Sequence, residues 1–191
     1  MGYLLGLQEY LNQTYETSVF DRIVRSKELW IFHIHGSRTA KATVLENLRY
    51  DMKLDLEGQI EDLPKTQVKF LYPAHFCKSV GPLIKIDKKV RDLGLGPIIS
   101  RRKRYFIKNK SLFPLMKEKQ VVYFTLLEGE IIRGIIIDFS RYDVTVSLKG
   151  GIPVTVLRHA VYDLRNKKGR CFLKSVQEEQ MDWQKSELFV P

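Results

Sequence analysis

The chain has 191 residues, of which 44% are hydrophobic and 11% aromatic, so it carries enough apolar side chains for packed cores and is not globally disordered. Its 32 lysines and arginines outnumber its 22 acidic residues, and the net charge of +10 favours a polyanionic partner such as a nucleic acid. The chain has two cysteines but no Cys-x-x-Cys pair, no basic leader and no apolar run of about 20 residues, which argues against disulfides, secretion and a membrane span. We therefore expect a cytoplasmic protein without membrane contact.

The first predicted element is a short amphipathic helix, because Leu4, Leu7 and Leu11 recur at helical spacing. Three strands are predicted after it from alternation or from β-branched and aromatic content, over residues 30–36, 49–56 and 68–71. A helix followed by short strands indicates a small, mainly β unit.

The next segment holds most of the excess charge. Between residues 78 and 110 there are eleven lysines and arginines but two aspartates, a net charge of +9. Gly81-Pro82 is typical of a loop, so we expect a linker between domains here. Four consecutive basic residues precede two aromatic ones, and we interpret them as an arm that follows RNA phosphates: Arg101, Arg102, Lys103 and Arg104. A solvated linker or a localisation signal is the alternative interpretation.

The second half of the chain begins with a brief helical turn that Ser111 could cap, with Pro114 tolerated in its first turn. Four strand-like runs follow, over residues 123–129, 131–137, 141–148 and 154–157. Gly134 interrupts the second of these runs and predicts a sharp bend in a long strand.

The two halves repeat the same landmarks in the same order. Residues 49–56 and 141–148 both begin with Arg-Tyr-Asp and end on a leucine in register. A glycine-bearing turn and a further strand follow each, and we match 68–71 with 154–157 because an alanine comes shortly after both. The predicted organisation is a domain at 1–76, a basic linker at 77–110, a domain at 111–166 and a tail at 167–191.

A helix, five bent strands and a Gly-x4-Gly pair resemble an Sm-like domain, and residues 112–165 resemble bacterial Hfq. Gly129 and Gly134 match the glycine pair of the first Sm motif. Residues 139–142 resemble its Phe-Asp-x-Phe segment, and residues 157–160 resemble the Tyr-Lys-His-Ala stretch that closes the second motif. The resemblance implies a mainly β fold of two small Sm-like five-stranded bent antiparallel barrels, each preceded by a helix and joined by a basic linker.

The resemblance also implies a function, the binding of U-rich single-stranded RNA in the pore of a ring. Tyr142 would stack on a base, while Arg158 and His159 would contact uracil and phosphate. Ser140 and Thr125 depart from the family pattern, the latter standing where Hfq has an aromatic that stacks on adenine. An activity as an RNA chaperone is a further implication.

In the first copy we place Tyr72-Pro73 at the position of the basic–histidine pair, so we expect this degenerate copy to lack the uridine site. Hfq rings hold six domains. A chain with two domains therefore implies a homotrimer, a pseudo-hexameric ring closed by pairing of strand edges.

Two other classes of function are considered. A non-catalytic Sm ring that presents surfaces to protein partners is the alternative to RNA binding. Four residues have i, i+2 spacing that could converge on zinc, although strand packing accounts for the first two: His33, His35, His75 and Cys77. The sequence has no nucleophile elbow, HExxH motif or phosphate-binding loop, so we expect no enzyme activity, no metal and no cofactor.

Overall fold

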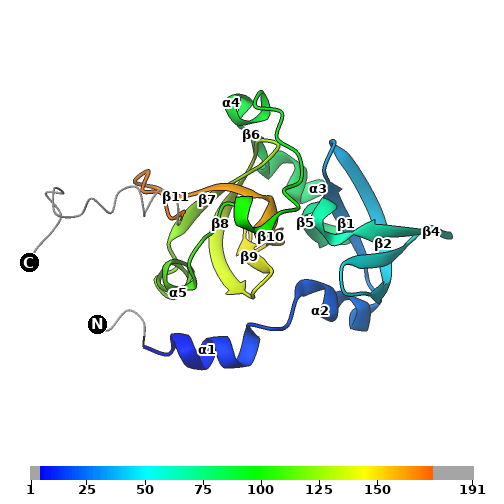
Figure 1. Ribbon diagram of the computed structural model, residues 1–191, viewed down its shortest axis with the longest axis horizontal. Helices are drawn as coiled ribbons and strands as arrows, with labels where there is room; N and C mark the ends of the chain where they lie inside the picture. Colours follow the sequence, from blue (N-terminus) through cyan, green and yellow to red (C-terminus); the bar gives the residue numbers. More distant parts are fainter. Residues whose placement is uncertain (1–4, 174–191) are drawn as a thin grey trace, which may run out of the picture.

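The computed structural model describes residues 5–173. Leu4 of the first predicted helix lies outside this range, and so do Glu178, Glu179, Trp183, Leu188 and Phe189, for which the sequence left open a docking helix or a flexible end. The described part is mainly β, an antiparallel sheet of eleven strands with short helices around it, which confirms the predicted class (Figure 1). No helix within residues 5–173 is long and apolar enough to span a membrane.

Ten strands form two sets of five with the same internal order. Copy one consists of β1 (Leu29–Ile34), β2 (Arg38–Asn47), β3 (Asp51–Leu56), β4 (Gln59–Pro64) and β5 (Val68–Pro73). Copy two consists of β7 (Val121–Leu126), β8 (Glu130–Phe139), β9 (Asp143–Ser147), β10 (Pro153–Leu157) and β11 (Val161–Asn166). The sheet runs β11-β7-β8-β9-β10-β5-β1-β2-β3-β4, so in each copy the fifth strand pairs with the first. The copies join where β10 pairs with β5.

The correspondence between the copies extends to their irregularities. The second strand of each has a register shift at the same place, between Val44 and Glu46 in β2 and between Ile136 and Asp138 in β8. A bulge kinks a strand and strengthens its twist, so one strand can pair along its first half with one neighbour and along its second half with another. Strand β8 does this with β7 and β9, as the predicted bend at Gly134 requires.

The sequence match between 68–71 and 154–157 was wrong by one strand. Strand β5 is the fifth of copy one, whereas β10 is the fourth of copy two. The counterparts of β10 and β11 are β4 and β5, and strands β2, β4 and β11 were incompletely predicted or missed. The error arose because β4 carries few apolar residues and leaves no strong strand signal.

Three helices matter for the arrangement: α1 (Leu7–Thr14), α2 (Val19–Ser26) and α5 (Asn109–Lys117). Helix α2 precedes β1 and packs on β2, while α5 precedes β7 and packs on β8, so each copy has one helix in the same place. Ser18 begins α2 in a capping box with Asp21, a signal that the sequence analysis missed. Helix α1 is additional and runs along copy two (Figure 1).

The predicted cap of α5 was wrong, because the helix begins at Asn109 and not after Ser111. Pro114 therefore lies inside the helix and removes one backbone hydrogen bond. Buried side chains of Leu112, Phe113 and Leu115 anchor the helix on copy two and offset that loss.

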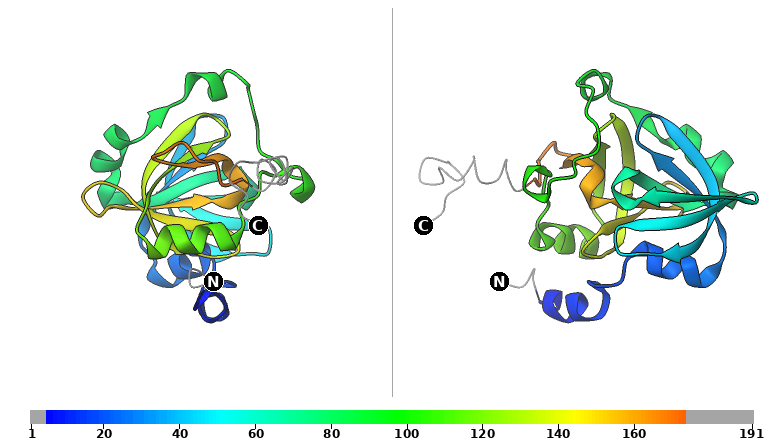
Figure 2. Two further views of the ribbon diagram at one scale, coloured as in Figure 1. Left: turned by 90° about the vertical axis from the view of Figure 1, so that its left-hand side faces the viewer. Right: turned by 45° about the vertical axis from the view of Figure 1, so that its right-hand side comes forward.

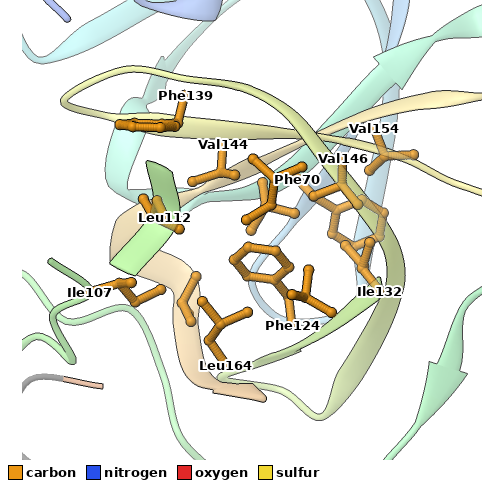
Figure 3. Packing of buried hydrophobic residues seen from close by; sticks show 14 of the residues in the cluster. Phe70, Ile107, Leu112, Phe124, Ile132, Phe139, Val144, Val146, Val154 and Leu164 are labelled. Carbon is orange, nitrogen blue, oxygen red and sulfur yellow. The ribbon is translucent and has the colours of Figure 1, made fainter. Parts of the chain in front are cut away.

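Two apolar clusters fill the copies, and each includes at least one residue from the other copy. Phe70 of β5 is fully buried in the cluster of copy two, beside Phe124 and Val146 (Figure 3). Leu157 of β10 is buried in the cluster of copy one. The joint between β10 and β5 is thus packed as a core, and we expect the copies to unfold together.

The linker is folded, which the sequence analysis did not predict. After the 3-10 turn η3 (Ala74–Phe76), the linker contains α3 (Cys77–Val80), η4 (Gly81–Leu83), β6 (Lys85–Ile86), α4 (Lys88–Arg91) and the 3-10 turn η5 (Arg101–Lys103). Strand β6 pairs with the start of β8. Helix α4 lies at the end of the molecule opposite α1 and α2, and the chain then returns along copy two to α5 (Figure 2).

Candidate nucleic-acid interface

Each copy presents an arginine and a tyrosine at the turn between its second and third strands. Platform one is Arg49 with Tyr50, and platform two is Arg141 with Tyr142. The guanidinium carbon lies 5.1 Å from the ring centroid in platform one and 5.9 Å in platform two. The tyrosines are 68% and 46% exposed, which leaves ring surface open to a ligand. Exposed aromatic rings beside guanidinium groups can stack on the unpaired bases of a single strand.

The same backbone hydrogen bonds hold both turns. The Leu48 N–H donates to Asp51 O over 3.0 Å, and the Ser140 N–H donates to Asp143 O over 2.9 Å. The two turns are therefore equivalent in geometry, and the platforms are repeated features of the fold.

In each copy a basic residue that follows the fourth strand donates hydrogen bonds to backbone carbonyls of this turn. In copy two, Arg158 donates its N–H to Tyr142 O and its Nη1 to Ser140 O, both over 2.9 Å. In copy one, Lys65 donates its N–H to Tyr50 O over 2.9 Å and its ammonium to Leu48 O.

Lys65 is therefore the counterpart of Arg158, and the assignment of Tyr72-Pro73 to that position was wrong. It failed because the two alanines used for the match follow different strands. Copy one keeps both the aromatic residue and the basic residue of this site.

Arg158 is committed to internal contacts. Its Nη2 donates to Ile107 O over 2.8 Å and to Asn109 Oδ1 over 3.0 Å, and its guanidinium lies 5.9 Å from the Phe106 ring. Burial lowers the pKa of Arg158 from its ordinary value, although nearby charges oppose that effect. The structure thus brings Arg158 to Tyr142 as predicted, but as a support for the turn and the linker.

His159 lies at the joint between the copies. Its Nε2 donates to Val68 O over 2.8 Å, which fixes the tautomer with the proton on Nε2. Burial is the main cause that lowers the pKa of His159 to about 4, and the charge of Arg104 lowers it further. His159 is therefore neutral at pH 7 and adds no positive charge to the surface.

The four basic residues of the linker divide into two roles. Arg104 donates Nε to Ile98 O over 2.8 Å and Nη2 to Ile99 O over 3.0 Å, and so holds its own loop together. Arg101, Arg102 and Lys103 form the turn η5 and are exposed. These three residues can meet phosphates without breaking a contact of the fold.

Backbone groups of the N-terminal segment bond directly to the turn of copy two. The Arg141 N–H donates to Tyr15 O over 2.8 Å, and the Val19 N–H donates to the carboxylate of Asp143 over 2.8 Å. Asp143 is buried, and burial raises its pKa. Tyr142 in this turn is 46% exposed, against 68% for Tyr50. The more open site is thus in the copy that the sequence analysis called degenerate.

A buried charge cluster joins the copies. Lys69 of β5 is 1% exposed, and its ammonium pairs with Glu128 and Glu130 of copy two. Glu128 also accepts from the Gly36 N–H over 2.6 Å, and its Oε1 lies 3.1 Å from His35 Nδ1. No local sequence pattern indicates this cluster, because its members are far apart in the chain.

Burial opposes ionisation of Glu128, but hydrogen bonds from Lys69 and Gly36 outweigh it and lower the pKa to about 2. Glu128 is thus ionised at neutral pH. The cluster borders a cavity of about 300 Å³ whose lining includes Lys69, Glu130 and His33.

The residues considered for zinc do not converge. His33 stacks on Phe70 with ring centroids 4.0 Å apart, and His35 contacts Glu128. The His75 ring contacts the Phe76 ring at a tilt of 47°, with centroids 4.0 Å apart. Within residues 5–173 no group of three or more histidine, cysteine or acidic residues could hold a metal ion.

No protein-family model matches this chain, and a search of curated proteins finds no match.

Proposed function

We propose that the chain binds single-stranded RNA, as an Hfq-like protein made of two tandem Sm-like barrels. The observation that carries this proposal is the repeated platform, Arg49 with Tyr50 and Arg141 with Tyr142, at the same turn of each copy. The net charge of +10 and the exposed turn Arg101–Lys103 support it, because phosphate contacts supply most of the sequence-independent affinity.

The family resemblance adds a preference for U-rich strands and a ring of three chains. The strand order agrees with a ring, because β10 and β5 already pair as two adjacent barrels of such a ring would. Three chains would close the ring by pairing the β4 edge of one chain with the β11 edge of the next. An annealing or chaperone role would follow from several stacking sites around one pore.

The experiment is a fluorescence-anisotropy titration of a U-rich hexanucleotide, with an A-rich one alongside, at low and moderate salt. Tyr50→Ala and Tyr142→Ala should each weaken binding about 5- to 150-fold, since a stacked base is worth about 1–3 kcal/mol. Tyr50→Phe and Tyr142→Phe are the matched controls and should bind like the wild type, because they keep the ring.

The salt dependence gives a second readout. The logarithm of the affinity should fall with the logarithm of salt with a slope of about −0.7 per phosphate contacted. Removing the charges of Arg101, Arg102 and Lys103 together should flatten that slope. If the alanine and phenylalanine variants bind RNA with equal affinity, the platforms do not take part in RNA binding.

A non-catalytic scaffold is the second candidate. It is favoured by Arg158 and His159, whose donors are used in internal hydrogen bonds, and by the edge of β4, which no strand within residues 5–173 pairs. Absence of RNA binding at low salt by the folded wild type would select this candidate.

A further inference from the structure

The two copies differ in what lies on the outer edge of their fifth strand. In copy one that edge belongs to β5 and is taken by β10, with Leu71 opposite Thr155 and Phe70 opposite Val156. Leu164 of β11 is the counterpart of Leu71, since Leu71 pairs with Phe32 of β1 and Leu164 pairs with Phe124 of β7. The edge at Leu164 is therefore the one on which the next barrel of a ring would dock.

The chain's own segment Arg170–Leu173 already occupies that edge. The Phe172 N–H donates to Leu164 O over 2.9 Å, and the Asn166 N–H donates to Arg170 O over 3.1 Å. Between these bonds Arg165 lies opposite Cys171. The segment returns through a turn in which the Gly169 N–H donates to Asn166 O over 2.9 Å.

The segment is also packed. Phe172 is 8% exposed and Leu173 is 5% exposed, and both belong to the apolar cluster of copy two. Leu173 forms a bridge with Ile107, whose carbonyl accepts from Arg158.

The opposite end of the sheet is unpaired. Strand β4 pairs with β3 on one side, and within residues 5–173 no strand lies on its other side. It carries Glu61 and Asp62, while β11 and the turn after it carry one acidic residue, Asp163, and four basic residues: Arg165, Lys167, Lys168 and Arg170. Two β4 edges would place acidic residues together, whereas β4 against the basic edge brings opposite charges together.

We propose that Arg170–Leu173 is a plug that closes the assembly edge of β11 to the β4 strand of a second copy of this chain. The plug occupies on β11 the place that β10 occupies on β5. The plug also protects the chain from uncontrolled association, since an unpaired strand edge is a template for pairing with another chain. The inference rests on the ring proposed above and adds a step that regulates its assembly. Chains assemble when β4 of one chain displaces the plug of another.

The register of the docked state follows from the internal joint. Asp62 and Leu63 correspond to Thr155 and Val156, so Asp62 would lie opposite Leu164 and Leu63 opposite Asp163. Leu164 O cannot accept from Phe172 and from an incoming strand in the same ladder position. Plug and partner are therefore mutually exclusive.

The releasing variant is Phe172→Pro in the full chain, which removes the N–H that bonds Leu164 O and leaves β11 unchanged. Phe172→Ala is the matched control, because it trims the ring but keeps that N–H. Light scattering after gel filtration measures the mass. The wild type should run as one chain of 22.4 kDa at low concentration, and Phe172→Pro should shift to three times that mass. Phe172→Ala should lie nearer the wild type.

The locking variant is Arg165→Cys with Cys77→Ser. Arg165 and Cys171 form a non-hydrogen-bonded antiparallel pair, for which Cα atoms are about 4.5 Å apart, a separation that accepts a disulfide. The oxidised protein should stay a single chain at concentrations where the wild type assembles, and dithiothreitol should restore assembly. This arm does not depend on whether Phe172→Pro folds.

Two results would overturn the plug: a wild type that is already a complete ring at low concentration, or an oxidised Arg165→Cys protein that assembles as readily as the reduced one. RNA titrations of the same proteins separate this outcome from the proposed function. Unchanged dependence on Tyr50 and Tyr142 would leave RNA binding in place while removing the plug. If RNA binding does not depend on these tyrosines, the proposed RNA-binding function is wrong. The masses measured by light scattering would still test the plug.

Discussion

Replacing Lys69 with methionine tests how the two copies are held together. The side chain of Lys69 is 2% exposed and pairs with Glu128, which is 18% exposed, and with Glu130, which is 12% exposed. Methionine fills a similar volume but leaves two carboxylates facing one another without a cation. Breaking a buried pair by removing one partner costs about 3–5 kcal/mol. Since small proteins are stable by about 5–15 kcal/mol, this variant should lose a large fraction of its free energy of unfolding.

The assay is urea unfolding followed by circular dichroism at neutral pH, with Lys53→Met as the control. Lys53 pairs with Glu46 over 3.1 Å but its side chain is 32% exposed, and such surface pairs are worth about 0–1 kcal/mol. If Lys69→Met proves no more destabilising than Lys53→Met, the buried cluster does not join the copies and the reasoning fails.

The pH dependence of the same variant follows from Glu128. Its folded pKa of about 2 lies below the ordinary value of 4.5, so the unfolded chain binds more protons between these values. The stabilisation by Glu128 is therefore complete above about pH 4.5 and is lost as the pH falls toward 2. Without Lys69 the carboxylates take up protons at higher pH, so the gap in stability between wild type and Lys69→Met should narrow on acidification.

Two further predictions concern stability. Gly134→Ala should destabilise the fold by about 1–3 kcal/mol in urea unfolding, because a Cβ at this position would lie 2.3 Å from the backbone Ser147 O. The control is Gly96→Ala, which should be neutral or slightly stabilising because a Cβ there meets open space. Equal unfolding curves for the two variants would contradict the close crossing of β8 and β9. The pKa values of His33 and His159 are both lowered to about 4 by burial, from an ordinary 6.5, so both should be neutral in the folded protein. The free energy of unfolding should therefore decrease as the pH is lowered from 6.5 to 4, because the unfolded chain binds more protons in this range. His159→Asn should make this dependence on pH less steep, as measured by thermal melts across the range.

The sequence predicts the elements whose signal is local. The alternating runs at 141–148 and 154–157 became β9 and β10, and the Arg-Tyr-Asp repeat marks the same turn in both copies. Strand β4 was missed because Leu63 is its single buried side chain, and a strand with one buried residue shows no alternation of apolar and polar side chains. Once β4 was missed, β5 was matched to the wrong strand, and Lys65 was not recognised as the counterpart of Arg158.

The sequence predicted part of the site but not the roles of its residues. Tyr142 was chosen from the resemblance to the Sm motif, whereas Arg49 and Tyr50 of the first copy were not predicted as site residues. The hydrogen bonds of Arg158 to Ile107 O and Asn109 Oδ1 span 51 and 49 positions, and no local pattern reports such contacts. The cluster of Lys69 with Glu128 also depends on how β5 meets the turn before β8, which is known only once the strand order is known.

The joint inside the chain also indicates what a joint between chains would need. Beside the β10–β5 pairing, Asp143 accepts from the Val19 N–H at the start of α2, where a carboxylate meets the positive end of a helix. Asp51 is the counterpart of Asp143, and α5 is the counterpart of α2. When β4 docks on β11 of a second chain, Asp51 would face the first turn of that chain's α5, which is next to Ile107. The plug contacts the same Ile107 through Leu173. Release of the plug and binding of Asp51 to α5 would therefore both act on the segment around Ile107. Assembly would then be cooperative with plug release.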